Sequence, residues 1–564
     1  MKAKVDLVDL SEEQIEQALA QAKALLPAAI FEVIENVVRA YLTLVKVLED
    51  KDTTIGRLRR VLFGPTSEKS QKVLAPQGQP DKKTKEEANG SGGKTQTKAP
   101  PPPPPGHGRN GQAAYRAAKT EHVPHHRLKS GDRCPGCRKG KVYDQRGKPG
   151  ILVRVTGQAP LTATIYQLQK LRCNLCGEIF EARPPPGVGR RKYDETAAGM
   201  IGLLKYGGGF PWNRLHKLER AVGIPLPPST QWEIVREAAR KLEPAYEELK
   251  RQAAQGEVLH NDDTAMRILA WMGKRREEHL RGQSKGAGGD DDDGEDLKPD
   301  LPARQTGRTG IFTSGIVSTL KGRQMALFFT GLKHAGENLR ALLAKRDRGL
   351  GPPIQMCDAL SRNLPKDLKT IVANCLAHGR RQFVDVVENF PPECEHVLRV
   401  LAEVYKNDAI AKKRRMTDSE RLSFHQEKSG PLMERLRAWM QDELDHRKVE
   451  PNSGLGQAIG YMLKHWEKLT LFLRKPGAPL DNNVCERALK KAILHRKNSL
   501  FYKTDNGARV GDVYMSLIHT CELNGVDPFD YLTQLQRYAK EVRARPEKWT
   551  PWNYRLAVPR SPPR

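Results

Sequence analysis

Three carboxylates stand at positions from which they could share metal ions. Asp262 lies within a predicted strand, Asp358 ends a later one, and Glu486 belongs to a helix that soon turns basic. Carboxylates from two strands and a helix form a two-metal site, and Mg²⁺ is the cation that prefers such oxygen ligands. This site would activate a water or a 3′ hydroxyl for in-line displacement at phosphorus.

Each carboxylate also has a structural interpretation. Glu486 and Lys490 have the i, i+4 spacing of an exposed helix ion pair, which contributes only a few tenths of a kcal/mol. Asp358 could be a turn cap, a common role for an aspartate at a strand end. Buried strand carboxylates repel one another and are costly without a cation, so a metal explains Asp262 better than the fold does.

Four cysteines form a second set of candidate ligands. CPGC supplies Cys134 and Cys137, and CNLC supplies Cys173 and Cys176. Two tight thiolate pairs are what a tetrahedral structural Zn²⁺ requires. A redox pair is the alternative, but no βαβ pattern surrounds the motifs.

Strands are predicted to position the aspartates. Three consecutive strands are predicted in EVLHNDDTAMRILAWM, TGIFTSGIVSTL and RQMALFFTG. A helix over 335–345 and the short strand PPIQMCD are predicted to follow. The first connection contains GDDDDGED, where a solvated loop is a better interpretation than a metal site because a glycine-rich linker does not preorganise ligands.

Helices are predicted to surround these strands. After Asp358 the chain is predicted to be helical through about 475, including the amphipathic stretch NCLAHGRRQFVDVV. Asp481, Asn482 and Asn483 are predicted to cap the helix that carries Glu486.

The segments before the strands predict separate units. Ten positions from Ile30 to Leu62 step alternately by four and three, with only Lys51 polar, which favours a coiled coil over a single amphipathic helix folded back on its domain. A linker with six consecutive prolines at 100–105 follows.

Two helices are predicted in PWNRLHKLERAVGIPLPPSTQWEIVREAARKLE, the second capped at Ser229 or Thr230. They predict either a helix-turn-helix that contacts DNA or a plain helical hairpin.

The charge balance narrows the partners. The chain has 95 Lys plus Arg against 67 Asp plus Glu, a net charge of +28. Such an excess favours a polyanionic partner, with nucleic acid the first candidate. The sequence has no apolar run of about 18 residues and no signal-peptide core, so we expect no membrane partner.

Several blocks, in order, resemble the DDE transposases of the insertion sequence sixty-six family. The blocks are RLRRVLFGPTSEKS, the paired Cys-x-x-Cys motifs, HNDDTAMRIL, IQMCDALSRN, NCLAHGRRQF, PLDNNVCERALKKAILHRKNSLFY and YMSLIHTCELNGVDPFDYL. The resemblance implies an RNase H-like core with a helical insertion between the second Asp and the Glu. It places the catalytic, Mg²⁺-binding carboxylates at Asp262, Asp358 and Glu486.

One departure from the family pattern leaves open which of two aspartates faces the metal. Where the family typically has Asp-Glu-Thr-Pro, this chain has Asp-Asp-Thr-Ala at 262–265. Neighbours on a strand face opposite sides, so either Asp262 or Asp263 could face the metal.

The remaining candidates have two interpretations each. Cys375 and His378 resemble the family's Cys-x-x-His block and could ligate a metal or face substrate, or could be a packed cysteine beside a hydrogen-bonded histidine. Six basic residues are candidates for contacting phosphates near the site, with a solvated side chain as the alternative: Arg380, Arg381, Arg487, Lys490, Arg496 and Lys497.

The predicted fold class is multidomain α+β. The predicted units are a coiled-coil oligomerisation segment (1–70), a linker (71–120), a zinc-ribbon-like domain (121–188), a helical DNA-binding region (189–255), the first part of the RNase H-like α/β core (256–360), a helical insertion (361–478), the end of the core with C-terminal helices (479–545) and an irregular tail (546–564).

The predicted function is Mg²⁺-dependent cleavage at transposon ends and strand transfer into target DNA. The alternatives are an inactive, transposase-derived zinc-containing DNA-binding protein and an RNase H-like nuclease without strand transfer. We expect two catalytic Mg²⁺ ions and a structural Zn²⁺. The predicted partners are double-stranded DNA (terminal inverted repeats and target), further copies of the chain and accessory proteins of the element. The predicted location is the bacterial cytoplasm, at the nucleoid.

Overall fold

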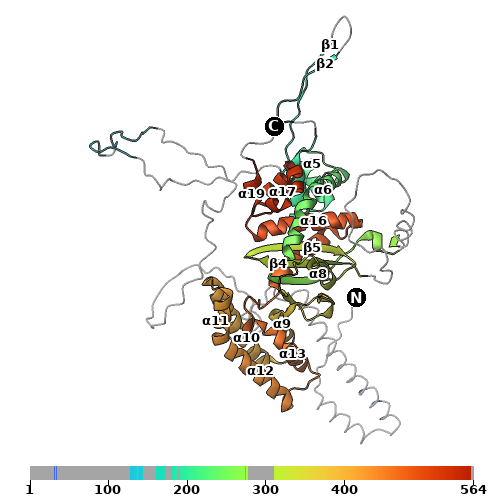
Figure 1. Ribbon diagram of the computed structural model, residues 1–564, viewed down its shortest axis with the longest axis vertical. Coiled ribbons are helices and arrows are strands. Elements are labelled where there is room, and N and C mark those ends of the chain that lie inside the picture. The colour runs from blue at the N-terminus through green and yellow to red at the C-terminus, as the bar shows by residue number, and fades with distance from the viewer. Residues whose placement is uncertain are drawn as a thin grey trace.

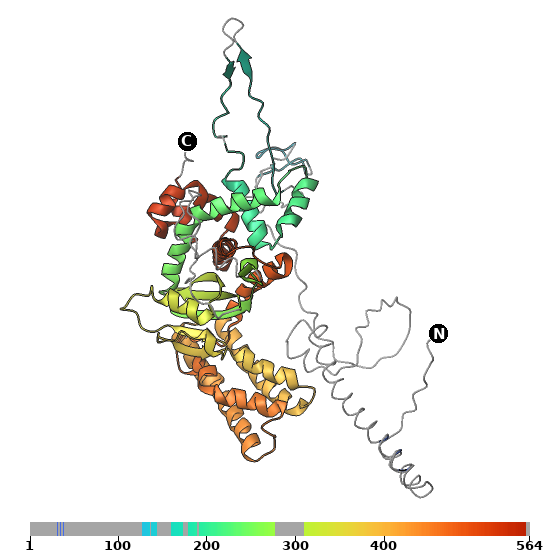
Figure 2. The same cartoon turned by 90° about the vertical axis from the view of Figure 1, so that its right-hand side faces the viewer.

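A central sheet lies between two groups of helices in the computed structural model of the chain (Figures 1 and 2). The structure describes residues 31, 34, 38, 127–135, 137–143, 160–172, 179–188, 191–273, 275–276 and 310–559. The predicted linker, the acidic GDDDDGED stretch and nearly all of the predicted coiled coil lie outside these residues.

The sheet has five strands in the order β5-β4-β3-β6-β7. Their bounds are β3 Val258–Ala265, β4 Phe312–Leu320, β5 Arg323–Gly331, β6 Ile354–Cys357 and β7 Ile371–Asn374. The β3–β4 and β4–β5 pairs are antiparallel, whereas β6 is parallel to β3 and β7 is parallel to β6. β3, the first strand of this sheet along the chain, is therefore central.

Local residue types explain the turn between β4 and β5. Lys321 and Gly322 both have positive φ, at 50° and 76°, as in the tight two-residue turns that match strand twist.

Ile371–Asn374 was expected to be helical but forms β7, which pairs with β6. A run of four residues is too short to show a period, and only its partner strand selects the extended form.

One group of helices covers the β3–β5 side of the sheet. Its members are α4 Glu195–Gly202, the π-helix η2 Leu203–Gly207, α5 Trp212–Ala221, α6 Pro228–Ala253, α15 Asn483–Ser499, α16 Asp505–Leu523, α17 Pro528–Arg537 and α18 Ala539–Ala544. Their buried apolar residues and those of β3, β4 and β5 form one core. The cap expected at Ser229 or Thr230 is wrong, because α6 begins at Pro228, a residue preorganised for the first helical position.

Side chains of α16 close the free edge of β5. Three backbone N–H groups of β5 donate hydrogen bonds to side chains of α16. The pairs are Thr330 with Asp512 (2.7 Å), Phe328 with Ser516 (3.0 Å) and Ala326 with Thr520 (3.1 Å). The three acceptors are spaced by four residues along one face of α16, while the donors are spaced by two along the strand. The helix thus accepts the hydrogen bonds of the β5 edge, to which a strand of another chain could otherwise pair.

A second group of helices packs against β6 and β7 around its own core. Its members are α9 Leu376–Val386, α10 Pro391–Lys413, α11 Asp418–Lys428, α12 Gly430–Asp445, α13 Gly454–Lys464, α14 Trp466–Leu469 and the 3₁₀ turn η6 Leu471–Leu473. These helices occupy most of the range expected to be an insertion, and the lower part of Figure 1.

Shorter elements complete the described chain. They are the hairpin β1 Lys170–Arg172 and β2 Ile179–Glu181, η3 Leu269–Trp271, α8 Ala335–Leu343, η5 Ser361–Asn363, η7 Pro546–Trp549 and α19 Tyr554–Ala557. The tail expected to be irregular therefore contains two short helices, held because Trp549 and Tyr554 are buried against the first core. No helix in the described ranges is long and apolar enough to cross a membrane.

Candidate active site

Two of the three carboxylates are brought together by the pairing of β3 with β6. His260 on β3 pairs with Met356 on β6 in a parallel register. Asp262 lies two residues further along β3, and Asp358 directly follows the last residue of β6, at the matching position. This register brings the two carboxylates to the same level and face of the sheet, and the charge of Asp358 acts on Asp262. The Asp358 carboxylate is oriented by hydrogen bonds from Leu360 N (3.2 Å) and Asn363 Nδ2.

The third carboxylate reaches this place because α15 packs closely on the sheet. Gly315 of β4 pairs with Asp262, and a Cβ there would lie 2.9 Å from Leu489 Cδ2 of α15. Cys485 donates its thiol hydrogen to Gly315 O (3.2 Å). The glycine thus lets the buried face of α15 approach β4, which brings Glu486, the residue after Cys485, close to Asp262.

Asn482 fastens the start of α15 to β3. It is the N-cap residue as expected, but its side chain makes no cap hydrogen bond. Its Nδ2 donates to Asn261 O (3.2 Å), and its Oδ1 lies 3.2 Å from His260 Nδ1. The expected capping role is therefore wrong for this side chain, which positions the whole helix. The Asp481 side chain does bind the start of the helix, since its Oδ1 accepts a hydrogen bond from Asn483 N (3.1 Å).

His260 was not among the residues identified from the sequence. It is 5% exposed, and burial lowers its pKa to about 4, so it packs as a neutral ring beside Asn482. Its position two residues before Asp262 was visible in the sequence, but its partner lies more than two hundred residues away, and no local pattern predicts that contact.

Negative charge accumulates around Asp262. Burial, together with the charges of Asp358, Asp263 and Glu486, raises the pKa of Asp262 to about 6. In the part of the chain that the structure describes, no Lys or Arg forms an ion pair with Asp262, Asp358 or Glu486. The Glu486 Oε1 atom is also buried, and no other described residue forms a hydrogen bond with it. An uncompensated set of oxygen donors fits hard divalent cations such as Mg²⁺.

Asp263 has a different environment from its neighbour. Its Oδ1 accepts a hydrogen bond from Ser314 Oγ (2.7 Å), and its Oδ2 accepts one from Ala335 N (3.0 Å). His334 Nδ1 also lies 3.0 Å from Oδ2, and the Asp263 side chain is only 1% exposed. Asp263 therefore joins β3 to β4 and to the start of α8, whereas Asp262 lies on the side of Asp358 and Glu486.

Cys375 and His378 lie next to Glu486. Cys375 is the N-cap residue of α9, and its Sγ accepts a hydrogen bond from Asn482 N (3.2 Å). Burial raises the pKa of the Cys375 thiol to about 12. His378 Nε2 is 3.8 Å from Glu486 Oε1, and one ligand atom of each of these three residues lies within 4.8 Å of the others. The helix ion pair between Glu486 and Lys490 is not formed.

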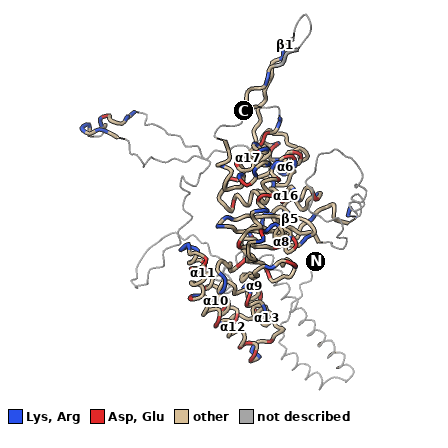
Figure 3. Tube along the Cα trace, in the orientation of Figure 1, with Lys and Arg blue, Asp and Glu red and all other residues tan. Residues whose placement is uncertain are grey.

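The six basic candidates separate into two groups. Arg487, Lys490 and Lys497 are exposed on α15. Arg496 instead binds the end of β3, where its Nη1 donates to Thr264 Oγ1 (3.2 Å) and Ala265 O. Arg380 and Arg381 are in the less accessible group, with Arg380 8% exposed and Arg381 half-buried in α9. Lys and Arg are otherwise spread among Asp and Glu over both helical groups (Figure 3).

One of the two cysteine pairs is described. Cys134 N donates to Gly140 O (2.7 Å), and Gly140 N donates to Cys137 Sγ (3.4 Å), which forms a tight turn around both sulfurs. The Gly140 hydrogen bond lowers the pKa of Cys137, which favours the thiolate that a metal requires. Cys173 and Cys176 lie outside the described residues.

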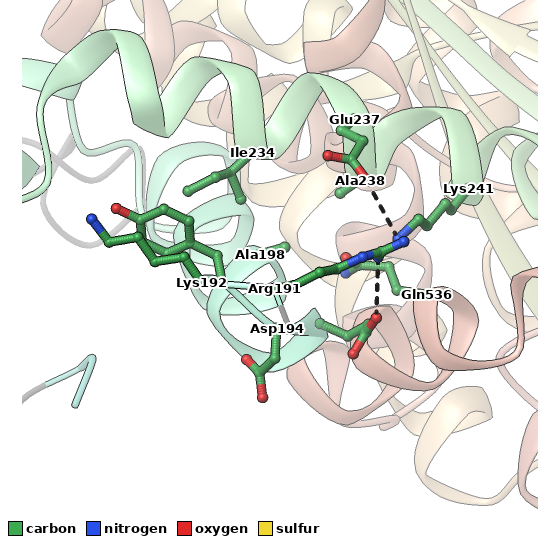
Figure 4. Close-up of a pocket in the computed structure, with 11 residues that line it drawn as sticks. Arg191, Lys192, Asp194, Ala198, Ile234, Glu237, Ala238, Lys241 and Gln536 are labelled. Carbon is green, nitrogen blue, oxygen red and sulfur yellow. Dashed lines mark ion pairs between the residues drawn. The ribbon is translucent and has the colours of Figure 1, made fainter. Parts of the chain in front are cut away.

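A separate pocket lies between the segment before α4 and the helices α6 and α17 (Figure 4). It has a volume of about 260 Å³, and two ion pairs lie on its wall, Arg191–Glu195 (3.7 Å) and Lys241–Glu237 (3.9 Å). None of the three carboxylates described above lines this pocket, and its charged residues are of both signs.

Comparison with known proteins shows a family match over the same residues. The model of the family described as "Transposase IS66 family" matches residues 192–281 and 316–510, half of the chain, and both ranges together include Asp262, Asp358 and Glu486.

Three proteins of Sinorhizobium fredii (strain NBRC 101917 / NGR234) are similar. Uncharacterized protein y4jD is 35% identical over 33% of this chain and 36% of its own length. Uncharacterized protein y4hP is 27% identical over 69% of this chain and 67% of its own length. Uncharacterized protein y4qI is 33% identical over 33% of this chain and 34% of its own length. The chain thus spans about a third of two of these relatives and two thirds of another.

Proposed function

Because the chain belongs to the transposase IS66 family, we propose that it is a DDE transposase that cleaves DNA at transposon ends and joins them to target DNA. Its catalytic residues are Asp262, Asp358 and Glu486. The observation that carries the proposal is their convergence from β3, the end of β6 and α15 into one uncompensated cluster.

The sheet supports an RNase H-like core. The first strand is central, an antiparallel pair extends the sheet on one side, and two parallel strands extend it on the other. An aspartate on the central strand, one after the adjacent parallel strand and a glutamate on a later helix are the positions that this core uses for its metal ligands. The helices between α9 and η6 are then an insertion before the glutamate.

Asp262, Asp358 and Glu486 are proposed to hold two Mg²⁺ ions. When bound, these ions supply the charge that activates a water, and later the 3′ hydroxyl, and that stabilises the leaving oxygen. Gly315 keeps α15 close to β4, Asn482 fastens its start to β3, and Asn363 orients the Asp358 carboxylate. Arg487, Lys490 and Lys497 bind phosphates beside the scissile bond.

The other units serve the same reaction. Cys134, Cys137, Cys173 and Cys176 bind a structural Zn²⁺, and α5 and α6 contribute to binding of the terminal repeats. The segment over 10–70 associates with further copies of the chain, and accessory proteins of the element complete the complex. The protein acts in the bacterial cytoplasm, on nucleoid DNA.

The test is cleavage and strand transfer with end-containing DNA and Mg²⁺. We expect Asp262→Asn, Asp358→Asn and Glu486→Gln each to lower the cleavage rate by about 10³-fold or more, the scale of losing one essential active-site group. Asp385→Asn, on the exposed side of α9, is the matched control and should cleave normally. Full activity in any of the three variants would remove that residue from the site.

The same assay separates the alternative functions. Cleavage without joining would identify a nuclease. Salt-sensitive binding to transposon ends without any Mg²⁺-dependent nicking would identify a DNA-binding protein that has lost catalysis.

A further inference from the structure

His378 and Glu486 face each other without a direct bond. The distance from His378 Nε2 to Glu486 Oε1 is 3.8 Å, which is too long for a hydrogen bond. Among the described residues, Glu486 Oε1, the oxygen that faces His378 Nε2, is buried without a hydrogen-bond partner. Buried polar atoms left unpaired cost stability, and native proteins tolerate them chiefly where a ligand or reaction uses them.

The fold holds this pair in place from both sides. Cys375 N donates to Cys357 O (3.0 Å), and Leu376 N donates to Leu480 O (3.0 Å), so the start of α9 is bound to β6 and to the segment before α15. The Cys375 Sγ accepts from Asn482 N at the start of α15. The first turns of the two helices are thus joined directly, and this joint sets the separation of His378 and Glu486.

We propose that His378 and Glu486 bind the same divalent cation, so that one of the two metal sites has a nitrogen ligand. The inference rests on the proposed function, in which Glu486 holds one of the ions. Metal–ligand distances of about 2.1 Å let one cation join donor atoms up to about 4.2 Å apart, and the observed 3.8 Å lies within that limit. Cys375 is a positioning residue, because its sulfur already accepts the Asn482 hydrogen bond.

The mixed ligand set predicts metal selectivity. Imidazole nitrogen binds transition-metal cations such as Mn²⁺ better than Mg²⁺, which prefers an all-oxygen environment. The site of Glu486 and His378 is therefore expected to bind Mn²⁺ more tightly than Mg²⁺, while the ion held by Asp262 and Asp358 discriminates less between them.

The test is Mn²⁺ binding to the full-length, zinc-loaded protein. Electron paramagnetic resonance counts the bound Mn²⁺, and electron spin echo modulation detects a directly bound ¹⁴N nucleus. We expect a ¹⁴N coupling in the wild type that His378→Ala abolishes, with the affinity of one Mn²⁺ lowered by about tenfold or more. His446→Ala, which removes an exposed histidine after α12, is the matched control and should change neither.

A second measurement does not depend on the variant folding. Wild-type protein labelled with ¹⁵N-histidine should lose the ¹⁴N modulation and gain that of ¹⁵N. An unchanged ¹⁴N signal in both the labelled protein and His378→Ala, or the absence of any nitrogen coupling, would overturn the inference. Histidine-dependent Mn²⁺ binding without DNA cleavage would instead support this site and contradict the proposed function, so the two can fail separately.

Discussion

Asp262 and Asp263 show how one residue of register separates two roles. Successive side chains on a strand point to opposite faces, so only one of the two can face Asp358. The Asp263 carboxylate accepts hydrogen bonds from Ser314 Oγ and from Ala335 N at the start of α8. Within the described part of the chain, Asp262 accepts only the hydrogen bond of Asp263 N (2.8 Å). The first residue is therefore the one available to a metal.

This difference predicts opposite effects on stability. At pH 7 the ionised Asp262 is unfavourable in the metal-free native state, because burial raises its pKa to about 6. Asp262→Asn should therefore raise the free energy of unfolding in Mg²⁺-free buffer. Asp263→Asn should lower it by about 2 kcal/mol, since it weakens charge-assisted hydrogen bonds to a buried carboxylate. Urea unfolding measures both, and equal effects of the two substitutions would contradict these assignments.

Among the elements, α15 connects most of the features described. Its start is bound by Asn482 to β3, its middle packs on Gly315, and its end contacts the π-helix η2. There Lys205 Nζ donates to Ser499 Oγ (2.8 Å) and lies 4.8 Å from the Trp212 ring. Burial of this lysine lowers its pKa to about 7.

The Lys205 pKa predicts a pH dependence of stability. Between pH 7 and about 10 the native state holds this lysine neutral while the unfolded chain keeps its proton, so stability should rise with pH over this range. The slope contributed by one such group is at most about 1.4 kcal/mol per pH unit. The measurement is urea unfolding of the wild type and Lys205→Met at several pH values. An identical pH dependence in the two proteins would show that Lys205 stays charged when buried.

At the scale of elements, the sequence predicted whether a segment is a helix or a strand better than it predicted where each element begins and ends. The strands β3 to β5 and the helix α9 lie where their patterns placed them, because each carries enough apolar residues to show its period, and β6 lies within the short run PPIQMCD. β7, the start of α6 and the helices of the tail were missed. Each is a short or terminal piece whose conformation depends on a partner strand, a proline or a buried tryptophan.

At the scale of the whole molecule, the basic side chains behind the net charge of +28 differ in how well they could contact DNA. Many basic side chains are paired, such as Arg421 with the buried Asp408 (2.8 Å) and Arg509 with Glu247 (3.1 Å). The exposed residues Arg487, Lys490 and Lys497 instead lie on the helix that carries Glu486. Position, more than total charge, should therefore decide which residues bind phosphates at the site.

This predicts a specific change in salt dependence. Replacing Arg487, Lys490 and Lys497 together by Gln should reduce the slope of log affinity against log salt by up to about 2.7, since each phosphate contact contributes about 0.9. A control of equal charge change replaces Lys413, Arg414 and Arg415, which are exposed at the C-terminal end of α10. Binding of end-containing DNA at several salt concentrations measures both, and equal slopes in the two triple variants would contradict a special role for α15.

The sequence by itself determined the residue types, the order of the elements and the blocks that resemble the transposase family, because composition, period and spacing are local properties. It placed three carboxylates on two strands and a helix. Only the tertiary structure decided that Asp262 and not Asp263 lies beside Asp358, that Asn482 fastens a helix instead of capping it, and that His378 faces Glu486. These contacts join residues far apart in the chain, and they depend on strand register and on the close approach of α15 at Gly315, which no local pattern encodes.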